Sequence, residues 1–122
     1  MADKLPTLTV DDLNVDVVRS EFSDDVLQTI IQVVIGGVDK YLLTPIKVTM
    51  NPEEIKLLYR EVERSSLIPL SKYIKQQLDE QVGGTFHVIY GRNYGMHVTH
   101  ERCNFAHIRV DDADVVCWKH GE

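Results

Sequence analysis

Histidines and cysteines gather in the second half of the chain, where their spacing could bring several of them onto a metal ion. His97 and His100 form an H-x-x-H pair, and Cys103 follows His100 after two residues. A zinc site usually takes four such ligands. His97 and His100 fall on a predicted strand, however, where an odd separation sends the two side chains to opposite faces. The pattern therefore favours ordinary histidines over a zinc site, and we expect neither a metal nor a cofactor.

A calcium loop is a second candidate, because Asp12, Asn14 and Asp16 match its first three ligand positions. The loop also requires a glycine at its sixth position and a glutamate at its twelfth. Val17 and Ser23 stand at these two positions. Both requirements fail, and an acidic, solvated segment is the better interpretation.

Catalytic motifs fail on similar grounds. Thr99, His100 and Glu101 carry suitable atoms, but neighbours on a strand face opposite sides and cannot form a nucleophile–base relay. Gly91 and Gly95 bracket a short loop that lacks the lysine and the following helix of a phosphate-binding loop. We predict that the protein is not an enzyme. A metal-dependent enzyme is the alternative of another class, and stoichiometric zinc on elemental analysis would reveal it.

Composition limits the partners. The 122 residues suffice for one domain, with 43% hydrophobic and 26% charged residues. A net charge of −6 without a basic stripe argues against nucleic acid and against a membrane surface. The longest apolar stretch, Ile30–Val38, is expected to be too short to span a bilayer. The start of the chain lacks the pattern of a secretory signal, so Cys103 and Cys117 are expected to be reduced thiols in the cytosol.

The front half of the chain predicts one strand and three helices. Residues 14–22 could form an edge strand, and Ser23 stands where a helix N-cap should, followed by two aspartates. Asn51 and Pro52 begin a second helix, and a third begins near Leu67–Pro69 and should stop at two glycines, residues 83 and 84. The first apolar stripe comprises Leu27, Ile30, Ile31, Val34, Val38 and Tyr41; the second comprises Ile55, Leu58, Tyr59 and Val62; the third comprises Leu70, Tyr73, Ile74 and Leu78.

From Thr85 onward the apolar period changes from helical to two. Strands are predicted at 86–90, 96–101, 105–110 and 115–119, with a turn at Asp111-Asp112. Helices followed by an antiparallel sheet predict an α+β fold.

A specific run then appears at residues 87–101, His-Val-Ile-Tyr-Gly-Arg-Asn-Tyr-Gly-Met-His-Val-Thr-His-Glu. It resembles the signature of the small, eight-kilodalton dynein light chains. The resemblance extends without a gap from about Leu70 to Gly121, and Ser23–Asp25 and Val38–Tyr41 resemble the two ends of the family's first helix.

On this alignment the chain is a single domain with a flexible start at 1–14 and a helical insert at 43–65. A competing alignment takes Pro45–Met50 as the first strand and residues 51–65 as the first helix. The insert's apolar stripe could pack on the domain or dock a neighbouring dynein subunit.

The resemblance implies a homodimer in which one strand of each protomer completes the sheet of the other. It also implies that targets bind as an added strand, so that backbone hydrogen bonds give affinity and alternate pockets give specificity. The implied peptide-binding residues are Asn93, Tyr94, Gly95, Val98, Thr99, His100 and Phe105. The implied dimer-interface residues are His87, Tyr94, Gly95, Val98 and Thr99, and protonation of His87 would oppose dimerisation.

Several positions depart from the family. Met96 and His97 replace a serine and a tyrosine, His107 and Arg109 replace two groove tyrosines, and His120 replaces a serine whose phosphorylation splits the dimer. The usual Thr-Gln-Thr target preference is therefore not expected to carry over.

The resulting functional prediction is a non-catalytic light chain of a dynein motor, bound to extended segments of dynein intermediate or heavy chains and located in the cytoplasm on microtubules. A general dimerisation hub outside the motor is the alternative. The sequence leaves open a cytoplasmic or a ciliary, axonemal motor, and a homodimer or a heterodimer.

Overall fold

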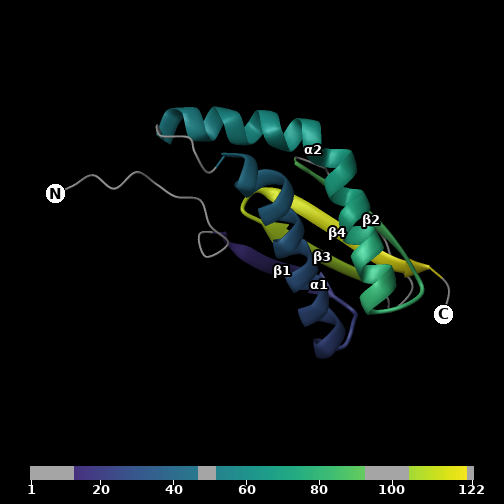
Figure 1. The fold of residues 1–122 in the computed structure, drawn as a ribbon. Coiled ribbons are helices and arrows are strands. Elements are labelled where there is room, and N and C mark those ends of the chain that lie inside the picture. Colours follow the sequence, from purple (N-terminus) through teal and green to yellow (C-terminus); the bar gives the residue numbers. More distant parts are fainter. Residues whose placement is uncertain (1–12, 47–51, 93–104, 121–122) are drawn as a thin grey trace.

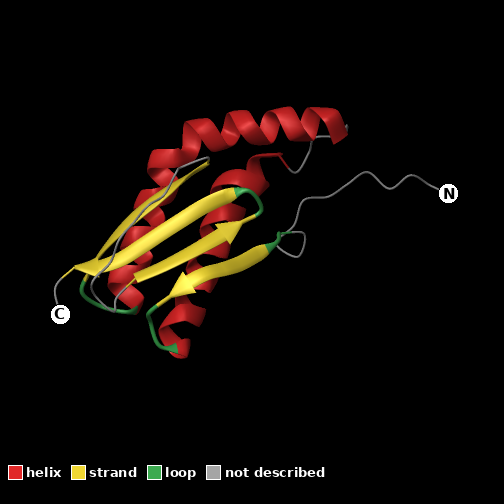
Figure 2. Cartoon of the chain, turned by 180° about the vertical axis from the view of Figure 1, so that it is seen from behind, coloured by secondary structure: helices red, strands yellow, loops and turns green. Residues whose placement is uncertain are grey.

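The computed structural model describes residues 13–46, 52–92 and 105–120. Its four strands form one antiparallel sheet in the order β1-β3-β4-β2, with α1 and much of α2 on one face (Figures 1 and 2). The strands are β1 (Val15–Ser20), β2 (Thr85–Arg92), β3 (Phe105–Val110) and β4 (Ala113–His120). This confirms the predicted α+β fold with helices packed on an antiparallel sheet. The predicted strand at 96–101 lies outside the described residues.

The first helix, α1 (Asp24–Val38), begins where the sequence predicts. The Ser23 hydroxyl accepts a hydrogen bond from the Val26 amide at 3.4 Å and so caps the helix. The helix then continues into a π-helical turn, Asp39–Leu43, and a short 3-10 turn, Thr44–Ile46.

The second helix, α2 (Pro52–Gln81), is a single element of 30 residues. The prediction of two separate helices divided near Leu67 is wrong, because the helix passes through Pro69. Proline lacks the N–H that would bond to the carbonyl of residue 65, and such a gap in the ladder bends a helix. Figure 1 shows that α2 bends near its middle. Beside this point the Ser66 hydroxyl donates to the Tyr41 carbonyl at 3.5 Å, which ties α2 to the middle of the π-helical turn.

The core lies between the helices and the sheet. The predicted apolar stripes of α1 and of the second half of α2 meet the alternate, helix-facing residues of β2, β3 and β4. The fully buried members include Ile30, Val34, Val38, Leu70, Ile74, Leu78, Phe86, Ile108 and Val115.

The helical segment Asp24–Leu43 corrects one expectation. An 18-residue window within these 20 residues has a mean hydropathy of 1.4, so the segment is long and apolar enough to cross a membrane by length and composition. The sequence interpretation considered only the stretch Ile30–Val38, which Gln32 and two glycines interrupt, and judged it too short. In the folded chain Ile30, Val34 and Val38 pack into the core against the sheet, so this apolarity is that of a core helix.

Two turns position the strands: one joins α2 to β2, and the other joins β3 to β4. Helix α2 ends as predicted at the glycine pair, where Gly83 and Gly84 have φ values of 98° and 90° that favour glycine. The β3–β4 turn at Asp111-Asp112 is also confirmed. Asp111 adopts φ 53°, which aspartate tolerates, and its amide and carboxylate bond to the backbone of Asn14 just before β1.

Candidate functional site

Most of the predicted peptide-binding residues cannot be placed. Asn93, Tyr94, Gly95, Val98, Thr99 and His100 lie in residues 93–104, outside the described residues. Phe105 is described as the first residue of β3 and is buried. His87 lies on β2 and stacks on Trp118 of β4, with 5.4 Å between the ring centroids. The roles of these residues at a groove or an interface remain predictions.

The strand that leads into this segment has one open side among the described residues. Strand β2 is at the end of the sheet and pairs only with β4 there. The amide of Phe86 donates to the Asp79 carboxylate of α2 at 2.7 Å, so this N–H does not point at β4. Residues of an antiparallel strand direct their N–H and C=O groups to alternate sides. It follows that the backbone N–H and C=O groups of Val88, Tyr90 and Arg92 point to the outer side of β2. Those of His87 point toward β4.

Asp79 is held firmly at the start of this edge. It also receives a hydrogen bond from Lys75 at 2.6 Å, one helical turn earlier. Burial works to raise the pKa of Asp79, but the hydrogen bonds from Lys75 and the Phe86 amide outweigh it and lower the pKa. The carboxylate is therefore charged at neutral pH and caps the first outward amide of the edge.

A polar cluster lies on the sheet face that is turned away from the helices. The buried carboxylate of Asp114 is 2.9 Å from Nε2 of His107 and accepts a hydrogen bond from Nε of Arg109 at 3.2 Å. Sequence analysis singled out His107 and Arg109 as departures from the family groove, but it missed Asp114. The signal was available, because a two-residue turn at 111–112 fixes the hairpin register and sets Arg109 opposite Asp114.

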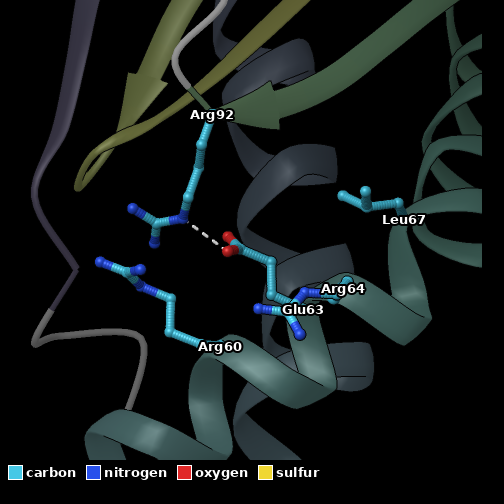
Figure 3. Close-up of a pocket in the computed structure, with 5 residues that line it drawn as sticks. All are labelled: Arg60, Glu63, Arg64, Leu67 and Arg92. Carbon is cyan, nitrogen blue, oxygen red and sulfur yellow. Dashed lines mark hydrogen bonds and ion pairs between the residues drawn. The ribbon is translucent and has the colours of Figure 1, made fainter.

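A second polar cluster joins α2 to the end of β2. The buried carboxylate of Glu63 accepts one hydrogen bond from Nε of Arg92 and another from the Tyr90 hydroxyl at 3.0 Å (Figure 3). Burial and the charge of Glu63 raise the pKa of Tyr59 to about 12. Burial opposes the charge of Arg92, but the bond to Glu63 outweighs it and raises the pKa of Arg92. Sequence analysis missed this cluster. The spacing places residues 59 and 63 on one face of a helix and residues 90 and 92 on one face of a strand, but nothing in the sequence indicates that the two pairs meet.

Residues with metal or thiol chemistry are not brought together in the described part of the chain. No three of its His, Cys, Asp and Glu side chains form a group that could hold a metal ion. Cys117 is a free thiol in the core, and burial raises its pKa to about 12, which keeps it protonated. Cys103 lies outside the described residues.

Comparison with known proteins identifies the family. The family described as dynein light chain type 1 matches residues 14–120. The chain belongs to the dynein light chain family. This match begins just before β1.

Relatives of this family member are divergent in sequence. It is 25% identical to the cytoplasmic dynein light chain of Emericella nidulans over 109 residues, which are 89% of this chain and 92% of that protein. It is 46% identical to the cytoplasmic dynein light chain 1 of Kluyveromyces lactis over 41 residues, which are 34% of this chain and about half, 47%, of that relative.

A solved structure shares the fold. The dynein light chain-like domain of a Fasciola hepatica calcium-binding protein aligns with a TM-score of 0.65 at 13% identity, over 95% of this chain and all of that domain. Membership of the family supports the role of a dynein light chain, and the solved structure supports the fold.

Proposed function

We propose that this protein is a non-catalytic, dimeric light chain of a cytoplasmic dynein motor that holds extended segments of larger dynein chains by strand addition. The observation that supports the proposal is the outer side of β2, where alternate backbone groups have no strand partner among the described residues. A sheet edge of this kind readily accepts another strand. Its relatives in Emericella nidulans and Kluyveromyces lactis are named cytoplasmic dynein light chains.

In the proposed dimer, residues 96–101 of one copy add to the outer side of β2 of the other. The segment that would cross over follows β2 directly in the chain, so a short connection suffices. The far side of each crossed strand then receives the target, with backbone bonds for affinity and alternate side-chain pockets for specificity. Two such sites in one dimer would bind a paired target about 100- to 10,000-fold more tightly than a single site does.

A peptide-binding experiment tests the proposal. Native mass spectrometry should give twice the 14.0 kDa chain mass. Decapeptides that tile the dynein intermediate chain of the same species should include one that binds, measured by calorimetry. N-methylation of that peptide at alternate residues should weaken binding strongly, because each methyl group removes a backbone donor to the added-strand ladder.

Methylation at the intervening residues is the matched control and should have little effect. A single-chain mass with no retained peptide would contradict the proposal. Equal losses at every methylated position would also contradict strand addition, because a ladder uses only every second N–H on one side.

A further inference from the structure

A small pocket lies where α2 meets the end of β2. It has a volume of about 170 Å³ and is lined by Leu67 and four charged residues, Arg60, Glu63, Arg64 and Arg92 (Figure 3). Arg60 and Arg64 are one helical turn apart on α2, and Arg92 is the last residue of β2. Pockets for cofactors and drug-sized ligands usually measure about 300–1,000 Å³, so this one suits a single small group.

The lining of the pocket has an excess of positive charge. Three guanidinium groups and one carboxylate give it a charge of +2, in a chain whose net charge is −6. Both oxygens of Glu63 already accept hydrogen bonds, one from Arg92 and the other from the Tyr90 hydroxyl. Glu63 therefore holds Arg92 in place but leaves the charges of the other two arginines uncompensated.

Arg92 is fixed in position before any ligand arrives. Its side chain is only 21% exposed, and its Nε donates to Glu63. This bond leaves the two Nη groups for other acceptors, and the second ion pair of Arg92 is a long one, 3.9 Å from Nη1 to the exposed carboxylate of Asp112. A side chain that is already ordered loses little conformational entropy when it binds an anion.

The two arginines of α2 have unused donors. Within the described part of the chain, neither Arg60 nor Arg64 makes an ion pair, and both are exposed. In Figure 3 the guanidinium groups of Arg60 and Arg92 point toward each other. Two like charges that approach in this way repel each other, and an anion between them would turn the repulsion into two attractive contacts.

The charge of the pocket and its donors indicate the chemical class of the anion. A phosphate group carries a charge of about −1.5 to −2 at pH 7 and has three strong acceptor oxygens. This matches the charge of the lining and its three guanidinium groups, each of which can bind phosphate through two parallel hydrogen bonds. A carboxylate carries a single charge and would compensate only half of the excess.

We infer that the pocket formed by Arg60, Arg64 and Arg92 binds a phosphate group. Inorganic phosphate and the side chain of a phosphoserine share this chemistry. All three arginines belong to one chain, and Arg92 projects toward α2, away from the outer side of β2. The inference therefore goes beyond the proposed function and depends neither on strand addition nor on a dimer.

A phosphate titration with arginine variants tests the inference. Inorganic phosphate is added to the assembled protein at pH 7 and constant ionic strength, while the Nε–Hε resonances of the arginines are followed by NMR. The resonances of Arg60 and Arg92 should shift together and reach saturation. Arg60→Gln and Arg64→Gln should each weaken binding about tenfold, the difference that one charge-assisted hydrogen bond supplies. Both positions are exposed, so neither variant should prevent folding.

Two control variants separate the pocket from the general charge of the protein. Lys72→Gln also removes one positive charge from an exposed position of α2 and should bind phosphate as wild type does. Asp112→Asn removes the carboxylate near Arg92, at a side chain that is 88% exposed, and should bind phosphate about twofold more tightly. Acetate, with a single charge, should bind at least about tenfold more weakly than phosphate.

N-acetyl-phosphoserine amide distinguishes the two sources of the phosphate group. If it binds, and Arg60→Gln weakens its binding, the pocket accepts a phosphorylated side chain; if inorganic phosphate alone binds, the ligand is the free ion. Three results would each overturn the inference: no saturable shift with either phosphate probe, acetate that binds as tightly as phosphate, or equal phosphate affinity in wild type and both arginine variants.

Discussion

Replacing Glu63 by leucine should lower the free energy of unfolding by about 3 kcal/mol, the usual cost of removing one partner from a buried ion pair. The side chain of Glu63 is only 5% exposed and that of Arg92 only 21%. Without the carboxylate, the guanidinium keeps its charge in a poorly solvated place, and the Tyr90 hydroxyl loses its acceptor. Urea denaturation at pH 7 and at one fixed protein concentration measures the loss, since dimerisation would make stability depend on concentration.

Two further variants separate charge from packing. The double variant Glu63→Leu with Arg92→Met removes both charges and should recover most of the loss, leaving about 1 kcal/mol for the unpaired Tyr90 hydroxyl. Glu61→Leu, at an exposed position of the same helix, should change stability by less than about 0.5 kcal/mol. A double variant as unstable as Glu63→Leu alone would show that the cluster acts by shape and not by charge compensation.

Replacing Gly37 by valine should lower the free energy of unfolding by about 2–3 kcal/mol, because it overfills a closely packed helix crossing. A Cβ atom at this position would lie 2.9 Å from Cδ1 of Leu70 and 3.1 Å from Cδ2 of Tyr73, both on α2. Leu70 is fully buried, and protein cores are close-packed, so a shift of its side chain would disturb its neighbours. Thermal denaturation followed by circular dichroism measures the effect.

The neighbouring glycine is the matched control. At Gly36 a Cβ atom would meet only the hydroxyl of Tyr73, at an ordinary 3.8 Å. Gly36→Ala should therefore stabilise the protein by about 0.5–1 kcal/mol through helix propensity alone. A Gly37→Val protein that is as stable as wild type would contradict the close approach of α1 to α2.

The elements with strong local signals were predictable from the sequence. Ser23 predicted the start of α1, and the glycine pair predicted the end of α2. The change of the apolar period at Thr85 predicted the sheet. Each of these features depends on residues only a few positions apart in the chain. Helix capping, a positive φ at glycine and the alternation of a strand are all local properties, so the sequence is enough to predict them.

Features that depend on tertiary contacts were not predictable in the same way. Proline favours the first turn of a helix, and the continuation of α2 through Pro69 depends on packing against the π-helical turn near Tyr41. The pairing of Glu63 with Arg92 joins residues 29 positions apart in the sequence. The charged residues around Glu63 in the sequence predict that it is exposed to solvent. Only the fold shows that Glu63 is buried.

The contact of Asp114 with His107 and Arg109 was predictable only in part. Both residues stood out in the sequence as departures from the family, but their link to Asp114 required the hairpin register. The two-residue turn determines that register, so the contact between Arg109 and Asp114 could be derived from the sequence once the turn was placed.

Hydrogen exchange along β2 tests the central claim most directly, with each amide resolved in the assembled protein and in samples diluted until native mass shows single chains. Assembly should protect the outward amides of Val88, Tyr90 and Arg92 by more than about tenfold, while the amides of His87 and Ile89, bonded to β4, should be protected in both samples. Outward amides that are equally protected in the single chain would mean that the chain itself closes its sheet edge, and this would contradict strand addition.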